Sequence, residues 1–200
     1  STFTARVITS TGADLGGVLS GALGALMGPL HGGAPSRVLD MLNEIGPAEN
    51  AESWISRALE KGDKLMGFGH AVYRAEDPRG VVLKQVAREL AQTLATPNNG
   101  ETPLELVERA ERIEKIILAY LRQHKPDSKI VTNVEYYAAI ALHLAGLEQD
   151  LFTAAFTVSR IVGWAAHTIE QSAQNKIMRP SARYTGALPD ELPDPDAMSA

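Results

Sequence analysis

The sequence contains no cysteine, and this absence excludes several kinds of chemistry. Without thiols the chain cannot form disulfides, use a thiolate nucleophile or bind a metal through sulfur. No pair among the five histidines has a spacing typical of metal ligands, so we expect no metal site. A reducing compartment fits this composition, and we expect a cytoplasmic protein.

Positive charge and long apolar runs are also scarce. The 19 Lys and Arg residues are outnumbered by 24 Asp and Glu residues, and a net charge of −5 argues against a nucleic-acid surface. The longest run without charged residues or histidine, Leu15 to Leu30, is too short to span a membrane and is rich in glycine. Ser1 opens the sequence without a signal-peptide pattern, and the Pro- and Asp-rich stretch from Leu188 to Ala200 is typical of a loose terminus. We expect neither a membrane nor a nucleic acid as partner.

Helical periodicity dominates the rest, and no alternating run of strand length interrupts it. The clearest case is Glu105 to Arg122, where apolar residues recur every three or four positions. Its wet side offers three ion pairs four residues apart: Glu105/Arg109, Glu108/Arg112 and Glu111/Lys115. Start and stop residues predict further helices at Asp77 to Leu94 (capped by Asp77, opened by Pro78), Ser53 to Lys61 (ended by Gly62) and Tyr136 to Ala145 (ended by Gly146). The fold class is therefore all-α, with more helices than a four-helix bundle.

Two apolar segments raise questions of packing. Asp150 to Gln171 is apolar nearly all round, which predicts a buried central helix. Arg160 would then be a costly buried cation, whose partner is Glu170, another protein carboxylate or a substrate carboxylate. In Leu15 to Leu30, glycines four apart on one helix face favour close approach of a second helix. That second helix belongs either to the same chain or to a partner subunit, and the residues leave both open.

Two polar residues lie close to predicted helix starts. His31 precedes Gly32-Gly33, where the backbone can approach a ligand, and Pro35, which opens a helix whose dipole favours a neutral imidazole. The plainer interpretation is a histidine that fills a turn. Glu135 lies in the first turn of a predicted helix, where a carboxylate commonly does no more than stabilise the helix dipole. Each residue alone favours the plainer interpretation.

A second group of candidates surrounds a glycine-containing turn. His70 follows Gly67-Phe68-Gly69, whose glycines can expose backbone groups to a ligand, and Arg74 just beyond it suits a phosphate. The alternative is a turn with a surface arginine. Arg79 is a cation in the first turn of a helix, against the dipole, and a bound carboxylate would account for it. The plainer interpretation, a surface arginine paired with Asp77 or Glu76, is favoured for this residue taken alone.

Taken together, these segments resemble the citrate synthase family. The resemblance keeps the family's order and covers nearly the whole chain, to about Gly186. It is carried by seven blocks: Ser1 to Ile8, Gly28 to Ala34, Gly67 to Arg74, Asp77 to Arg79, Asn133 to Tyr137, Ser159-Arg160 with Gly163 to His167, and Arg179 to Tyr184.

The resemblance implies an enzyme that condenses acetyl-CoA with oxaloacetate and water to citrate and CoA, with no permanently bound cofactor. Its implied catalytic residues are His31 at the acetyl oxygen, Glu135 as the base that takes a methyl proton, and His70 at the oxaloacetate carbonyl. The implied substrate-binding residues are Arg79, Arg160, Arg179 (reaching in from the partner subunit), Ser1 and Asn133. The implied CoA-binding residues are Gly67, Phe68, Gly69 and Arg74.

A layout also follows from the resemblance. It implies a small domain at 33–146, parts of a large domain at 1–32 and 147–200, and a homodimer with the glycine-rich helix at its interface. Two features depart from the family pattern. Glu135 stands where many members carry Asp, which moves the carboxylate one methylene further. The family's N-terminal segment, with an oxaloacetate-binding histidine, is missing from the sequence, so we expect the isolated chain to have little or no activity.

Two rival functions stay open at this point. A 2-methylcitrate synthase uses propionyl-CoA with the same residues, and a difference of one methylene in the pocket discriminates by only about 1–3 kcal/mol. The other rival is a non-catalytic CoA-binding or assembly module, with the missing segment supplied as another chain.

Overall fold

The computed structural model describes residues 1–28, 31–32, 34–69, 77–94, 100–126, 130–174 and 176–186. Its regular elements are helices: α1 (Thr2–Thr9), α2 (Leu15–Leu26), α3 (Ala34–Ile45), η1 (Ala48–Asn50), α4 (Ala51–Lys61), α5 (Pro78–Thr93), α6 (Pro103–His124), α7 (Val134–Leu144), η2 (Gln149–Leu151) and α8 (Phe152–Ser172). Within these residues, β-pairing is limited to an isolated antiparallel bridge between Phe68 and Thr132. The predicted all-α fold is confirmed.

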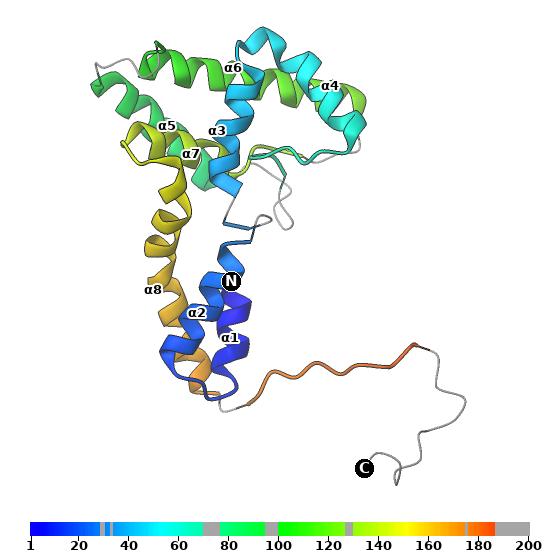
Figure 1. Ribbon diagram of the computed structural model, residues 1–200, viewed down its shortest axis with the longest axis vertical. Helices are drawn as coiled ribbons and strands as arrows, with labels where there is room; N and C mark the ends of the chain where they lie inside the picture. The colour runs from blue at the N-terminus through cyan, green and yellow to red at the C-terminus, as the bar shows by residue number, and fades with distance from the viewer. Residues whose placement is uncertain are drawn as a thin grey trace, which may run out of the picture.

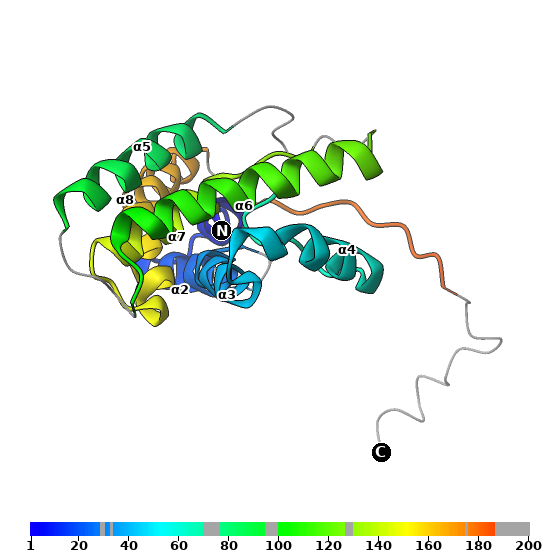
Figure 2. The same ribbon diagram turned by 90° about the horizontal axis from the view of Figure 1, so that it is seen from above.

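The helices form a body and a stalk (Figure 1). Helices α3 to α7 make the body, and α8 descends from it beside α2 and α1 to make the stalk. Viewed from above, the long helix α6 spans the body with α5 on one side and α4 on the other (Figure 2). The extended segment 176–186 leaves the far end of the stalk. No described helix is both long and apolar enough to cross a membrane.

Several helix ends follow directly from their sequences. Thr102 and Glu105 form a capping box at the start of α6, in which Thr102 Oγ1 accepts from the Glu105 N–H at 3.2 Å and the Glu105 carboxylate accepts from the Thr102 N–H at 2.7 Å. Asp77 caps α5 ahead of Pro78, and Gly62 ends α4 with φ of +75°. The predicted start of α5 and end of α4 are confirmed.

Two hydrophobic cores hold the body and the stalk. Buried residues between Val38 and Phe152 form the core of the body, on which all of α3 to α7 converge. A smaller core in the stalk joins α1, α2 and α8 through Ala5, Val18, Ala22, Leu26 and Trp164. Gly21 of α2 faces the Ile8 side chain of α1, where an added Cβ would collide. This glycine therefore serves a helix pair inside the chain, whereas nothing lies near Gly24.

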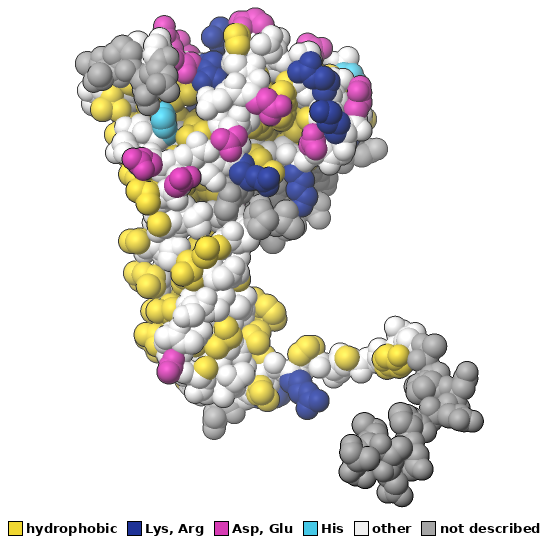
Figure 3. Space-filling model, in the orientation of Figure 1, with side chains coloured by type: hydrophobic (Ala, Val, Ile, Leu, Met, Phe, Trp, Pro, Cys, Tyr) yellow, Lys and Arg dark blue, Asp and Glu magenta, His cyan; other side chains and the backbone are white. Residues whose placement is uncertain are grey.

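Helix α8 differs most from its prediction. It was expected to be buried, but within the described chain only Phe152, Trp164 and Gln171 are buried along it. Val158, Val162 and Ile169 are each more than 70% exposed. The reason is that α1 and α2 cover one side of the stalk, which leaves apolar side chains on its surface while charged side chains gather on the body (Figure 3). Composition showed that the helix is apolar but not which of its faces has a neighbour.

The predicted ionic partners are also corrected. Arg160 is exposed and not buried, and Glu170 pairs with Arg6 of α1 instead. Along α6, none of the three predicted i,i+4 pairs comes within ion-pair distance among the described residues, because neighbouring segments supply closer partners. The observed pairs along α6 are Arg109 with Glu101, Arg112 with Glu49, Arg88 with the buried Glu111 and Lys84 with the buried Glu114.

Candidate active site

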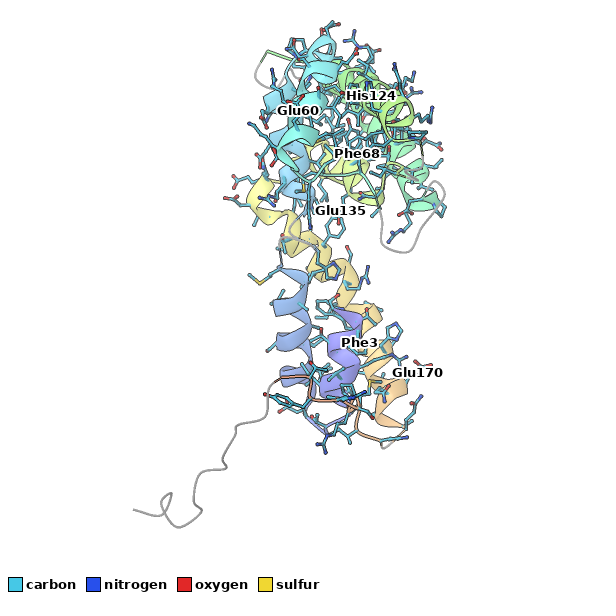
Figure 4. The ribbon with its side chains drawn as sticks, turned by 90° about the vertical axis from the view of Figure 1, so that its right-hand side faces the viewer. Phe3, Glu60, Phe68, His124, Glu135 and Glu170 are labelled. Carbon is cyan, nitrogen blue, oxygen red and sulfur yellow. The ribbon has the colours of Figure 1, made fainter. Side chains whose placement is uncertain are left out.

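Glu135 lies in the first turn of α7, at the level where the body meets the stalk (Figure 4). The side chain of Asn133 caps this helix, its Oδ1 accepting from the Glu135 N–H at 3.0 Å. Burial raises the pKa of Glu135 to about 7, and the positive charge of Arg79 partly opposes that rise. Near neutral pH this carboxyl group is therefore poised between its two forms, as a general base requires.

The segment Gly67 to Gly69 is fastened beside the start of α7. The Gly69 N–H donates to the Val131 carbonyl at 2.8 Å, and the Asn133 N–H donates to the Gly67 carbonyl at 2.9 Å. Asn133 Nδ2 also donates to the Gly69 carbonyl at 2.8 Å. The Gly69 N–H is therefore already bonded within the chain, whereas each of the two carbonyls has accepted one hydrogen bond and keeps a second lone pair. That these glycines offer backbone groups to a ligand stays a prediction.

The backbone conformation and the close surroundings of Gly67 disfavour any residue with a side chain. Its φ is +79°, and a Cβ at this position would lie 2.8 Å from Cδ2 of Tyr136. The Phe68 ring meets the Tyr136 ring edge-on, with centroids 5.2 Å apart. The turn and the first turn of α7 therefore pack as one unit, which fixes Phe68 near Glu135 in the view of Figure 4.

A second group gathers on the stalk side. His31 lies between α2 and α3, and its Nε2 is 3.0 Å from the Ser1 hydroxyl oxygen and 3.3 Å from the Ser1 nitrogen. Burial lowers the pKa of His31, and the positive charge of Arg160 lowers it further. Neutral imidazole is thus favoured, as predicted, although these causes differ from the helix dipole on which the prediction rested.

Arg79 and Arg160 come together at one cavity. This cavity of about 500 Å³ lies between α5, α7 and α8, with Arg79 and Arg160 on its lining. Its other walls are largely apolar: Leu83, Val86, Leu90, Val134, Ala138, Ala141, Leu142, Ala145, Ala155, Phe156 and Ser159. Two cations on apolar walls suit an anionic small molecule. A larger cavity of about 750 Å³, between α3, α6 and the end of α7, contains none of the predicted site residues.

No other predicted site residue among those that the structure describes lines this cavity. His70 and Arg74 lie outside the described residues. Arg179 is exposed on the extended segment that leaves the stalk, just after Met178, whose N–H donates to Ser10 Oγ at 2.9 Å. The structure therefore joins Arg79, Glu135 and Asn133 in the body and Ser1, His31 and Arg160 on the stalk side, and it leaves Arg179 apart.

Sequence reasoning missed a buried polar cluster behind Glu135. Lys84 of α5 and Tyr137 of α7 both bind the carboxylate of Glu114 of α6. A signal was present, since Lys84 and Arg88 are four residues apart on α5 and Glu111 and Glu114 three apart on α6. Such complementary charge on two neighbouring amphipathic helices indicates that they face each other.

Comparison with known proteins decides the family. The family model described as citrate synthase, C-terminal domain, matches residues 1–181. The chain belongs to the citrate synthase family. Its relatives include the putative citrate synthase 2 of Mycobacterium tuberculosis, 50% identical over 94% of this chain and 48% of that protein. They also include citrate synthase 2 of Bacillus subtilis (45% identical, 93% and 46%) and a 2-methylcitrate synthase of Shewanella oneidensis (37% identical, 96% and 48%).

Solved citrate synthases share the fold. The enzyme of Thermotoga maritima superposes with a TM-score of 0.80 at 39% identity, covering 96% of this chain and 49% of that one. The enzyme of Thermoplasma acidophilum, in a ternary complex with carboxymethyl coenzyme A and oxaloacetate, gives a TM-score of 0.82 at 31% identity, covering 98% and 50%. The chain thus spans about half the length of the citrate synthases it matches.

Proposed function

We propose that the chain carries part of the active site of a citrate synthase, which condenses acetyl-CoA with oxaloacetate. The observation that carries this proposal is the cavity shared by Arg79 and Arg160, because two guanidinium groups suit a substrate with two carboxylates. The charge of Arg79 acts on Glu135 and that of Arg160 acts on His31, so a base and a hydrogen-bond donor accompany the same two cations. The ligands of the Thermoplasma acidophilum enzyme support oxaloacetate and a CoA thioester as the substrates.

The proposed reaction uses each group at a stated atom. Glu135 takes a proton from the acetyl methyl group, while neutral His31 donates a hydrogen bond to the thioester oxygen as negative charge develops there. The resulting carbon nucleophile attacks the ketone carbon of oxaloacetate, whose oxygen takes a proton from His70. Water then hydrolyses the citryl thioester, and citrate and CoA leave. Because CoA enters as the acetyl thioester and leaves as the free thiol, no permanently bound cofactor is needed.

Binding roles complete the proposal. Arg79 and Arg160 hold oxaloacetate carboxylates, and Arg179 does so in the partner subunit. The Ser1 hydroxyl supports His31 and the substrate next to it. Asn133 acts at the substrate site by holding the turn against the base, and the CoA segment comprises Gly67, Phe68, Gly69 and Arg74.

The proposed layout divides the chain into a small domain at 33–146 and large-domain parts at 1–32 and 147–200. The separate hydrophobic cores of body and stalk support this division. A homodimer is supported by the apolar side chains that α8 exposes, since such a face commonly packs against protein. The cytoplasmic location and the inactivity of the isolated chain stay predictions.

Release of CoA thiol from acetyl-CoA plus oxaloacetate, measured on the natural full-length protein, tests the function. We expect turnover that requires both substrates. The relative named 2-methylcitrate synthase makes propionyl-CoA the matched alternative substrate, and a higher kcat/KM with it would assign that activity instead. If no thiol is released from either acyl-CoA, the chain is a binding module and not a synthase.

A further inference from the structure

Three helices of the body meet at one buried carboxylate. Glu114 of α6 is 8% exposed, and its Oε2 accepts from Lys84 Nζ of α5 at 2.8 Å and from the Tyr137 hydroxyl of α7. The Lys84 ammonium also lies 4.9 Å from the centroid of the Tyr137 ring. Burial and Glu114 raise the pKa of Tyr137 far above its ordinary value, so this hydroxyl stays protonated and donates at any working pH.

The two helices that bind Glu114, α5 and α7, also carry Arg79 and Glu135. On α5, Lys84 follows Arg79 by five residues, and on α7, Tyr137 follows Glu135 by two. Between them the helices touch closely, since a Cβ at the buried Gly80 of α5 would lie 3.8 Å from the Asn133 carbonyl oxygen. Any slip of α5 against α7 would therefore change the separation of Arg79 and Glu135 at the end of the pair.

A buried carboxylate is costly unless its partners are held in place, which makes such a cluster sensitive to register. Glu114 has one partner on α5 and one on α7, so both of its contacts are kept only at a single register of α5 against α7. The neighbouring Glu111 is different: its carboxylate accepts hydrogen bonds from Arg88 of α5 and, within the described part of the chain, from no residue of α7.

We propose that Glu114, Lys84 and Tyr137 are positioning residues that hold Glu135 at a fixed separation from Arg79. The inference rests on the proposed function only in taking Glu135 as the base. Charged side chains border this end of α7 on two sides: Arg79 with its partner Asp77 on α5, and Arg160 across the cavity on α8. Arg79 lowers the pKa of Glu135 against the effect of burial, so loosening the cluster weakens that lowering and the pKa rises.

Direct titration of the Glu135 carboxyl group tests the proposal on the natural full-length protein. The probe is ¹³C-labelled glutamate, with the Glu135 signal assigned by its loss in Glu135→Gln. We expect Tyr137→Phe and Lys84→Met each to raise the pKa of Glu135 by about 0.5–1 pH unit. Methyl-proton exchange at pH 7 should then fall about two- to fivefold and recover at pH 9. Lys84→Arg, which keeps the cation, should keep the parental pKa.

Glu111→Gln is the matched control, because it removes a buried carboxylate three residues away that ties α6 to α5 but not to α7. We expect it to lower the melting temperature and leave the pKa of Glu135 unchanged. An unchanged pKa in both Tyr137→Phe and Lys84→Met, or an equal rise in Glu111→Gln, would overturn the proposal. The titration needs no turnover, so a parent protein without synthase activity would contradict the proposed function and leave the positioning result readable.

Discussion

The Asp77 carboxylate accepts three hydrogen bonds from Arg79. It accepts from the Arg79 backbone N–H at 3.0 Å, from Nε at 3.0 Å and from a terminal guanidinium nitrogen at 2.7 Å. Asp77 is buried, whereas about half of the Arg79 side chain is exposed toward the cavity. Asp77 thus has two roles. It caps α5, and its negative charge offsets the unfavourable position of the Arg79 cation at the positive end of the helix dipole. The pairing proposed from sequence for this arginine is confirmed, and it leaves the guanidinium on the cavity lining.

The two roles of Asp77 can be separated by substitution. Asp77→Asn keeps a side-chain oxygen for the cap but loses the charge, whereas Asp77→Ala loses both. We expect the free energy of unfolding to fall by about 1 kcal/mol in the first case and about 2 kcal/mol in the second. Urea unfolding measures both. Asp14 is the matched control, since it caps α2 in the same way, accepting from the Gly17 N–H at 2.8 Å. Equal losses in Asp77→Asn and Asp77→Ala would show that the cap contributes nothing.

Arg160 should matter for binding and hardly at all for folding. Because the side chain is exposed, Arg160→Leu should change the unfolding free energy by no more than about 0.5 kcal/mol. Oxaloacetate affinity should weaken by about 1.5–3 kcal/mol, the value of a hydrogen bond to a charged group. Calorimetry of oxaloacetate binding and a thermal melt measure the two effects. Arg122→Leu, an exposed arginine at the far end of α6, is the control and should change neither. Unchanged affinity in Arg160→Leu would remove this residue from the substrate site.

Arg160 should also set the protonation of His31. Its positive charge contributes to the lowered pKa of His31, so Arg160→Leu should raise that pKa toward the ordinary value. The neutral imidazole needed at the thioester oxygen would then give way to imidazolium at a higher pH than in the parent. Titration of the His31 Cε1–H signal by NMR measures the shift, and Arg122→Leu should leave it in place. A pKa that stays fixed in Arg160→Leu would mean that the charge of Arg160 does not act on His31.

The local sequence was sufficient to predict several helix ends, but it was not sufficient to predict which helices pack against each other. Asp77-Pro78 and Gly62 act within one turn of chain, so the start of α5 and the end of α4 could be predicted residue by residue. The exposure of Arg160 could not, because it depends on which helices cover α8, and an apolar helix looks the same whether or not its partners are present. The resemblance located Glu135 and His31, whereas their residue environments alone favoured plainer roles.

Contacts between helices account for most of what was missed. Glu111 fits an exposed i,i+4 pair with Lys115 in sequence, yet it is 6% exposed and bound to Arg88 of another helix. The charge pattern that Glu114 shares with Glu111 points to α5 as a neighbour, but it does not identify Lys84 and Tyr137, which are 30 and 23 residues away, as the partners of Glu114. Pair rules within a helix cannot rank such long-range partners, which are set by packing.

Gly67 should tolerate no side chain. Gly67→Ala combines a positive φ with a Cβ placed 2.8 Å from Tyr136, so we expect a loss of about 2–4 kcal/mol in the free energy of unfolding. Gly62→Ala is the matched control, since its φ of +75° is similar but open space surrounds it, and it should lose only about 1 kcal/mol. Chemical denaturation of both variants gives the difference. Equal losses would mean that backbone conformation alone, and not contact with α7, fixes this glycine.

The ionisation of Glu135 should control the exchange of acetyl methyl protons. As the base, it must be ionised, so exchange of acetyl methyl protons with solvent deuterium should rise with pH through about 7. Glu135→Gln should abolish this exchange while oxaloacetate binding persists, because the amide keeps size and polarity but cannot accept the proton. Glu135→Asp should keep partial exchange, since the shorter carboxylate still ionises but lies further from the methyl group. Equal exchange in Glu135→Gln and the parent would falsify the base assignment.

The stability of the same variant gives an independent check on the protonation of Glu135. Its folded pKa of about 7 lies above the ordinary 4.5, so stability linked to the protonated group is complete below pH 4.5 and is lost as pH rises through 7. Glu135→Gln does not titrate and escapes this loss. Its advantage over the parent should therefore grow from pH 5 to pH 8, by on the order of 1 kcal/mol after solvent screening. Urea unfolding at the two pH values measures it. A residue that only stabilised the helix dipole would be ionised at both pH values, so Glu135→Gln would be less stable than the parent by the same amount at pH 5 and at pH 8.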